Sequence, residues 1–149
     1  MRKLLALVFS IVSFGVVFAA GDCSNIKFNN IKAKAIQMEK AWDSANLKGV
    51  VSFYDDDFIY MSGGKTYTNK QKVLKHYVDS FATASDDKKD IGRLRLNYQY
   101  CRELNQNQQL VIMEFVWTSP QGKTEKGHDL LVWQKDKKED YKIIVDFPQ

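Results

Sequence analysis

The sequence lacks the short motifs by which several classes of enzyme are recognised. It has no glycine-rich phosphate loop, no nucleophile elbow, no Ser-His-Asp arrangement and no pair of histidines at metal-ligand spacing. Its two histidines are His76 and His128, and its two cysteines, Cys23 and Cys101, stand far apart with no histidine nearby. The sequence therefore predicts no zinc or other metal site and no cofactor.

The chain also lacks a cluster of basic residues. It has 22 Lys and Arg against 18 Asp and Glu, a formal net charge of +4, and the two signs are interspersed. This pattern requires neither nucleic acid nor an anionic membrane as a partner. We expect no nucleic-acid partner. Nor do we find an internal repeat or a low-complexity tract that would indicate a second domain.

Residues 1–20 have the layout of a secretory signal peptide. Arg2 and Lys3 precede an apolar run from Leu4 to Phe18, and small residues follow at 19–21. Cleavage fits after Ala19 or after Gly21. The apolar run is short for a membrane span, which needs about 20 residues, so an uncleaved anchor is the less favoured alternative. We predict a signal peptide at 1–20 and one domain at 21–149, exported to the periplasm or secreted, with no membrane contact after cleavage.

Export makes a disulfide between Cys23 and Cys101 the favoured state of the two cysteines, because the space beyond the inner membrane is oxidising. The bond would tie the start of the first helix to the middle of the sheet. It would close a loop of about 78 residues, contributing roughly 4 kcal/mol in the chain-entropy model. The alternative is two free thiols too far apart to meet.

Apolar periodicity predicts helices first and strands afterwards. Residues from Ile31 to Ala45 repeat at helical spacing, a short helix follows from Leu47 to Tyr54 with Asn46 as its N-cap, and a third helix is predicted over 69–82. The acidic run Asp55 to Asp57 is expected to end the second helix and face solvent. Strands are predicted at 58–62, 65–68, 93–102, 110–118, 126–135 and 141–147. This order predicts an α+β fold with helices on one face of a curved sheet.

The order of these elements resembles a known superfamily. The segment from Ala41 to Lys70 runs helix, short helix, acidic corner, strand, Gly63-Gly64 turn and helix, and the final hairpin spans 128–146. Over Ile31 to Phe147 the chain resembles the nuclear transport factor 2-like superfamily, which includes ketosteroid isomerases and SnoaL-like polyketide cyclases. The resemblance implies a cone-shaped curved antiparallel sheet wrapped around three N-terminal helices, enclosing a pocket. It does not imply one function.

The isomerase chemistry of that superfamily does not carry over at its expected position. The carboxylate base of the ketosteroid isomerases would fall near Ser62, and a serine cannot take that role unless another group activates it. The oxyanion-hole donors have no secure counterpart. The catalytic residue is therefore unknown, and the candidates are Glu114, Asp146 and His128.

Each of the three candidates has a structural alternative. Glu114 lies within an apolar strand, and we favour an outward position paired with Arg93 or Arg95 over a buried position in the cavity. Asp146 is a candidate for the pocket mouth, or a partner for a turn or helix end. His128 and its neighbour Asp129 point to opposite faces of a strand, and either could pair across to Asp146 or Glu114. A histidine near a strand end is more often structural than catalytic. We expect His76 at the surface.

Aromatic residues make up 13% of the chain and suit a lined cavity. Trp42, Tyr60, Tyr98 and Trp117 are the predicted ligand-binding residues, and a buried tyrosine hydroxyl needs a partner. The favoured hypothesis is an exported domain whose cone binds a small, largely apolar molecule, without assured catalysis. One alternative is an acid–base enzyme of isomerase, cyclase or dehydratase type. Another is a structural or interaction module that forms a homodimer through the open sheet face.

Overall fold

The computed structural model describes residues 21–81 and 90–149, so the predicted signal peptide at 1–20 lies outside the described residues. Three helices precede most of the sheet, after a short 3-10 turn, η1 (Ile26–Phe28). Across these two stretches, no helix is both long enough and apolar enough to cross a membrane. The helices and strands are α1 (Asn29–Asp43), α2 (Leu47–Val51), β1 (Tyr54–Ser62), β2 (Lys65–Tyr67), α3 (Lys70–Phe81), β3 (Arg93–Asn105), β4 (Gln108–Thr118), β5 (Thr124–Lys135) and β6 (Tyr141–Pro148).

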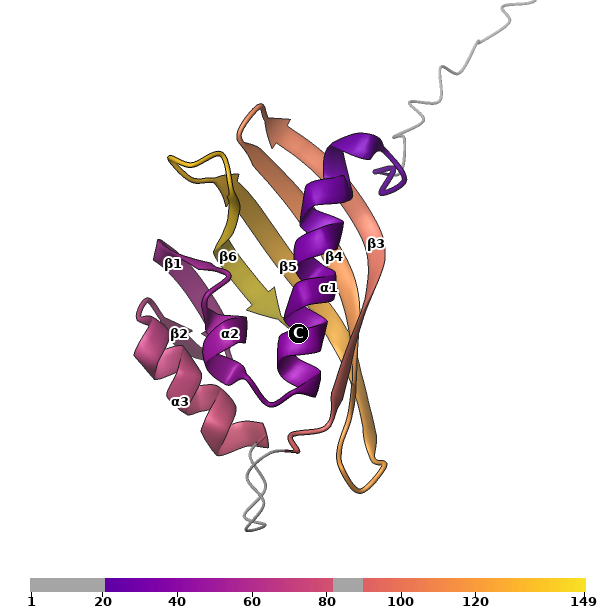
Figure 1. The fold of residues 1–149 in the computed structure, drawn as a ribbon, viewed down its shortest axis with the longest axis vertical. Helices are drawn as coiled ribbons and strands as arrows, with labels where there is room; N and C mark the ends of the chain where they lie inside the picture. Colours follow the sequence, from indigo (N-terminus) through magenta and orange to yellow (C-terminus); the bar gives the residue numbers. More distant parts are fainter. Residues whose placement is uncertain (1–20, 82–89) are drawn as a thin grey trace, which may run out of the picture.

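The six strands form one curved sheet in the order β2-β1-β6-β5-β4-β3. The pair β1 and β6 is parallel, and the other neighbouring pairs are antiparallel. Helix α1 crosses the sheet in front of β3, β4 and β5, while α2 and α3 lie at the β1 and β2 end (Figure 1). The α+β prediction is confirmed, with one correction: the sheet is mostly antiparallel because the C-terminal strand returns beside β1.

Helix α1 packs on the sheet through the stripe that its spacing predicted. Ile31, Ala35, Met38 and Trp42 are buried at helical intervals. Acids of the same helix bond to β3, the strand at the edge of the sheet. A carboxylate oxygen of Glu39 accepts the Leu96 amide at 2.7 Å, and Asp43 accepts the Leu94 amide at 3.2 Å. These bonds satisfy donors that an edge strand otherwise leaves open.

The second helix is shorter than the sequence predicted, and the first strand is longer. Asn46 caps α2 by accepting the Gly49 amide at 2.9 Å, but the helix ends at Val51 and β1 begins at Tyr54. Tyr54 pairs with Ile143 of β6, and the strand shifts register between Tyr54 and Ile59. Pairing with β6 overrides the local signal of the acidic run. This boundary matters because, as the first residue of β1, Tyr54 directs its side chain into the interior.

The predicted bond between Cys23 and Cys101 is present, with the two Cα atoms 4.9 Å apart. It joins the segment before α1 to the middle of β3. Nearby, Lys27 and Glu103 form an ion pair at 2.7 Å. The N-terminal end of α1 is thus held to the sheet by a covalent bond as well as by packing.

Candidate functional site

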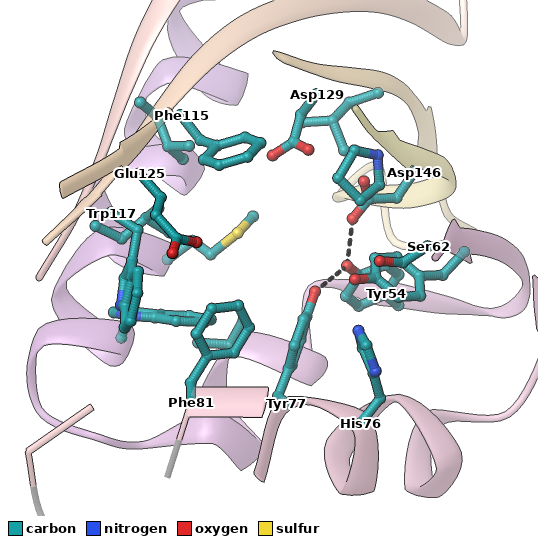
Figure 2. A pocket seen from close by; sticks show the side chains of 18 residues that line it. Tyr54, Ser62, His76, Tyr77, Phe81, Phe115, Trp117, Glu125, Asp129 and Asp146 are labelled. Carbon is teal, nitrogen blue, oxygen red and sulfur yellow. Dashed lines mark hydrogen bonds between the residues drawn. The ribbon is translucent and has the colours of Figure 1, made fainter. Parts of the chain in front are cut away.

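A cavity of about 200 Å³ lies between the helices and the inner face of the sheet. Every helix from α1 to α3 contributes to its wall, as do all the strands except β2. Figure 2 shows the lining side chains surrounding an open centre. Most of the wall is apolar; its aliphatic part consists of Met38, Val50, Leu94, Leu96, Leu131 and Pro148.

Aromatic rings form one side of the cavity. Trp42 makes edge contacts with Phe81 and Tyr77, at centroid distances of 4.9 and 5.6 Å, and Phe81 contacts Trp117 at 5.2 Å. The Trp117 indole N–H donates to the carbonyl of Ile91 at 2.8 Å, which fixes that ring. The Trp42 indole nitrogen is buried and has no hydrogen-bond partner among the described residues. This wall is rigid, apolar and rich in π faces.

Phe115 completes the aromatic wall because its cross-strand partner is a glycine. Phe115 pairs with Gly127 of β5, and a Cβ on Gly127 would lie 2.5 Å from the Phe115 ring. The same Cβ would lie 2.2 Å from the carbonyl oxygen of Gln149, whose backbone bonds to His128. Contacts this short do not occur in proteins, so any side chain at Gly127 would move the ring or the C-terminal strand.

Two acids lie on the opposite side of the cavity. In the sheet register, Asp146 pairs with Leu131 while Asp129 pairs with Pro148, so the two acids are diagonal neighbours on the inner face. Asp146 is only 6% exposed. The Oδ1 atoms of Asp129 and Asp146 are both buried without a hydrogen-bond partner in the described structure. Figure 2 shows both side chains at the edge of the open centre.

A chain of hydroxyl groups leads to the second oxygen of Asp146. The Tyr54 hydroxyl donates to Asp146 Oδ2, and the Tyr54 and Tyr77 oxygens are 2.8 Å apart (Figure 2). Because Tyr54 donates its proton to the acid, its oxygen is left to accept from Tyr77. Helix α3 and strands β1 and β6 therefore meet in one buried hydrogen-bonded chain, which fixes the Asp146 carboxyl.

Burial makes both acids hard to ionise. Burial raises the pKa of Asp146 to about 7, against a smaller opposing effect of the Tyr54 hydrogen bond. The pKa of Asp129 is raised well above its ordinary value, first by burial and then by the charge of Asp146. Two neighbouring carboxylates resist double ionisation, so the pair holds a proton near neutral pH. Burial also raises the pKa of both Tyr54 and Tyr77, which keeps them protonated donors.

His76 and Ser62 line the cavity beside the tyrosines. His76 is half-buried, and its Nδ1 lies 3.4 Å from the Tyr67 hydroxyl, so the prediction of a surface histidine is wrong. Burial lowers the pKa of His76, and the charge of Asp79 acts weakly in the opposite direction. The His76 ring packs against the rings of Tyr67 and Tyr60, at centroid distances of 5.2 and 5.7 Å. Ser62 occupies the wall where the superfamily resemblance expected a carboxylate.

The three catalytic candidates separate onto two faces of the sheet. Asp146 lines the cavity, whereas Glu114 and His128 are cross-strand partners on the outer face. Glu114 accepts a hydrogen bond from the Asn97 amide at 3.1 Å. The alternative that put Glu114 in the cavity is wrong, because Met113 and Phe115 on either side of it point inward.

The favoured outward position of Glu114 is correct, but its expected partners are not. Arg95 binds Asp43 of α1 at 2.9 Å, and Arg93 lies 3.8 Å from the same carboxylate. The outer face also carries half-buried apolar side chains, including Ile112 and Leu130. The homodimer through this face stays a prediction.

Of the predicted ligand-binding residues, Trp42, Tyr60 and Trp117 line the cavity. Tyr98, on β3, does not line the cavity. It pairs with Met113 of β4, and its buried hydroxyl has no partner within the described residues. Tyr98 shares a face of β3 with Leu94 and Leu96, which do line the cavity, but it lies further along the strand and outside the cavity wall. Whether these residues bind a ligand stays a prediction.

Sequence reasoning did not identify Tyr54 or Tyr77 as members of the polar site, and it gave the approach of Asp129 to Asp146 only as one of several alternatives. Asp129 carried a usable signal, because it precedes the buried Leu131 by two positions and therefore shares its face. Tyr77 carried none, since its position fits a core stripe equally well. In the stretches 21–81 and 90–149, no three His, Cys, Asp or Glu side chains are grouped so that they could hold a metal ion.

No family model matches the sequence, and no curated protein matches it either. Solved structures do match the fold. An NTF-2 like protein of unknown function from Shewanella oneidensis MR-1 has a TM-score of 0.71 and 18% identity, over 83% of this chain and 98% of that one. A ketosteroid isomerase-like protein from Erwinia carotovora atroseptica has a TM-score of 0.63 and 18% identity, over 83% and 95%.

A third match is an NTF2-like protein of unknown function in nutrient uptake from Rhodospirillum rubrum. Its TM-score is 0.59 and its identity 17%, over 80% of this chain and 96% of that one. Together these structures show that the chain has the NTF2-like fold. At such identities the likeness extends to the fold alone, so function must be argued from the cavity itself.

Proposed function

We propose that this chain is an exported binding domain whose cone takes up a small, largely apolar molecule and anchors it on Asp129 and Asp146. The observation that carries the proposal is the pair of buried Oδ1 atoms without partners at the wall of an otherwise apolar cavity. A few convergent polar groups in an apolar cavity are the usual form of a small-molecule site.

The two acids are costly to bury in an apolar cavity. Burying a carboxyl group without full hydrogen bonding costs several kcal/mol. An apolar residue at either position would fill the cone at no such cost. A ligand that supplies the missing donor offsets the penalty, which is a physical reason for the acids to be there. The volume of about 200 Å³ lies below the range typical of drug-sized sites, about 300–1,000 Å³, and indicates a ligand about the size of one substituted ring.

The disulfide supports the export part of the proposal. Bonds such as Cys23–Cys101 persist in oxidising compartments and are rare in the cytosol. The N-terminal layout of charged, apolar and small residues supports the same destination. Fractionation of cells expressing the tagged full-length chain, with intact-mass measurement of the product, tests it. Export predicts loss of 19 or 21 residues and no free thiol; a full-length cytosolic product with free thiols would contradict it.

A second candidate function is acid–base catalysis, and it is favoured by the pKa of about 7 for Asp146. A carboxyl group that titrates near neutrality, fixed by a tyrosine donor, can both give and take a proton. The arrangement differs from the one expected from the superfamily, since the acid, Asp146, comes from β6, and Ser62 occupies the position where the carboxylate base was expected. Conversion of the bound molecule by the purified protein would distinguish catalysis from binding.

Native mass spectrometry of the exported protein tests the binding proposal. The wild-type chain should carry a reproducible small mass that is lost on mild denaturation. An Asp129→Asn, Asp146→Asn double variant should carry much less of it, because the anchors have changed. Glu114→Gln is the matched control, since it alters an acid on the outer face of the same sheet. Equal occupancy in all three proteins, or none in the wild type, would contradict the proposal.

A further inference from the structure

We propose that the ligand of this cavity is an organic monocation, an ammonium group carried on a flat aromatic or apolar body. The inference rests on the binding function proposed above and names the chemical class of the ligand. It follows from two features of the wall taken together: the sign of the charged groups that face the cavity, and the aromatic rings opposite them.

The charged lining residues are acids. Asp129 and Asp146 present unpartnered oxygens, and Glu125 lies at the exposed rim, where it pairs with Lys123 at 2.6 Å. No lysine or arginine belongs to the lining as the structure describes it. Lysines do occur in an adjoining shallow groove that shares Ser62 and His76 with the cavity; there Lys75 pairs with Asp79 at 2.8 Å. An anionic ligand would therefore meet only like charges in the cavity.

The opposite wall suits the body of such a cation. Phe81, Phe115 and Trp117 border the open centre of the cavity in Figure 2, and Trp42, which also lines it, packs edge-on against Phe81. The negative faces of aromatic rings attract a desolvated cation by about 2 kcal/mol or more in favourable cases. An ammonium group also supplies N–H donors to the carboxylates of Asp129 and Asp146, which line the cavity, whereas a neutral ketone or ether cannot donate to them. Both walls therefore favour the same ligand class.

The direction of the pH dependence separates a cation from a neutral acceptor ligand. A cation binds the ionised carboxylate, whereas a carbonyl ligand needs a protonated acid to donate to it. The titratable groups that share the cavity with Asp146 come from three elements. Strand β1 contributes Tyr54 and Tyr60, α3 contributes His76 and Tyr77, and β5 contributes Glu125 and Asp129; the cavity residues of α1, α2, β3 and β4 do not titrate.

Of these groups, the buried acids Asp129 and Asp146 are the ones that change charge near neutral pH. The tyrosines keep their protons because burial raises the pKa of Tyr54, Tyr60 and Tyr77. Burial lowers the pKa of His76, so that group is neutral above pH 6.5. Between pH 6.5 and 8, ionisation of the coupled pair Asp129 and Asp146, with a pKa of about 7 at Asp146, therefore dominates the change in charge at the cavity wall.

The test is calorimetric titration of the disulfide-bonded domain with three probes of matched shape: 2-phenylethylammonium, 2-phenylethanol and 3-phenylpropanoate. The ammonium should bind at least tenfold more tightly than the alcohol, and the carboxylate should not bind detectably. Ammonium affinity should rise about fourfold from pH 6.5 to 8, because the ionised fraction of Asp146 rises from about a quarter to about nine-tenths over that range. In Asp146→Asn that pH dependence should flatten and ammonium affinity should fall at least tenfold.

The outcomes separate the two proposals. If the alcohol binds as tightly as the ammonium, or if affinity falls as the pH rises, the cation is rejected while the binding function stands. If none of the three probes binds, both proposals are rejected for ligands of this size. Asp129→Asn provides a second variant in case Asp146→Asn folds poorly. Glu114→Gln should bind all three probes like the wild type.

Discussion

The two faces of the sheet treat the same kind of residue in opposite ways. On the outer face, Glu114 lies across from His128 and accepts a hydrogen bond from Asn97. On the inner face, one residue along β5 from His128, Asp129 meets Asp146 in an apolar cavity, and each acid keeps an oxygen without a partner. A single step along β5 thus takes a side chain from the outer face of the sheet to the buried inner face. The chemistry of the site comes from the face on which the acid lies.

Burial is the property that distinguishes an acid with a functional role in this molecule from one without. An acid that can reach water or an amide costs the fold little, and its presence needs no further explanation. An acid held in an apolar cavity opposes folding, and a protein that keeps two of them together either uses them or loses stability. Substitutions on one face at a time, with the other face as the control, therefore test this difference.

The largest contrast is expected in the pH dependence of stability. The folded pKa of Asp146 is about 7 and lies above the ordinary value of 3.8, so the folded state binds the extra proton between those limits. The stability gained from this bound proton is therefore fully present below pH 3.8 and is lost as the pH rises to 7. At about 1.4 kcal/mol per pKa unit, the loss is of the order of 4 kcal/mol.

The substitution Asp146→Asn should remove this pH-dependent loss of stability. Urea unfolding at pH 4 and pH 8 should show the variant gaining stability relative to the wild type by up to about 4 kcal/mol between the two pH values. Glu114→Gln, on the outer face, should keep a constant difference from the wild type within about 0.5 kcal/mol. An Asp146→Asn difference that is the same at both pH values would contradict the raised pKa.

The second contrast concerns packing on the two faces of β4. Met113 is 0% exposed on the inner face, whereas its neighbour Ile112 is half-buried on the outer face. Met113→Ala should destabilise the domain by about 3 kcal/mol, because it leaves a cavity in a closed core. Ile112→Ala should cost about 1 kcal/mol. Equal losses in thermal unfolding would indicate that the outer face is covered in solution, as the predicted homodimer requires.

Much of this organisation could be predicted from the sequence, and the failures have local causes. The stripe of α1, the Asn46 cap and the strand alternation each depend on neighbouring residues, so periodicity alone indicated them. The start of β1 at Tyr54 depends on parallel pairing with Ile143, which is distant in sequence. Local signals at Asp55 to Asp57 therefore indicated the wrong boundary.

The polar site was harder to predict than the fold for the same reason. Asp146 was a candidate because an acid between Val145 and Phe147 is unusual. Its hydrogen bond from Tyr54 and its neighbour Asp129 depend on the order β1-β6-β5 in the sheet. That order comes from tertiary pairing and leaves no trace in the spacing of residues within any one segment.

A smaller effect is expected when the tyrosine chain is shortened. The Tyr54 hydrogen bond lowers the pKa of Asp146 against the larger effect of burial, so Tyr54→Phe should raise that pKa further. The loss of the bond should also cost about 1–2 kcal/mol of stability. Carbon-13 NMR titration of the aspartate carboxyl groups measures the first effect. Tyr98→Phe is the matched control: its hydroxyl lies outside the cavity, so the titration of Asp146 should not change.

The smallest effect is expected for the cross-strand pair on the outer face. His128→Gln leaves Glu114 bonded to Asn97, and His128 itself is exposed. Its stability should stay within about 0.5 kcal/mol of the wild type, and ligand occupancy in native mass spectrometry should be unchanged. A clear loss of occupancy in this variant, with Asp129→Asn unaffected, would reverse the assignment of the two faces. The functional acid would then be Glu114, and Asp129 and Asp146 would lower stability without serving the function.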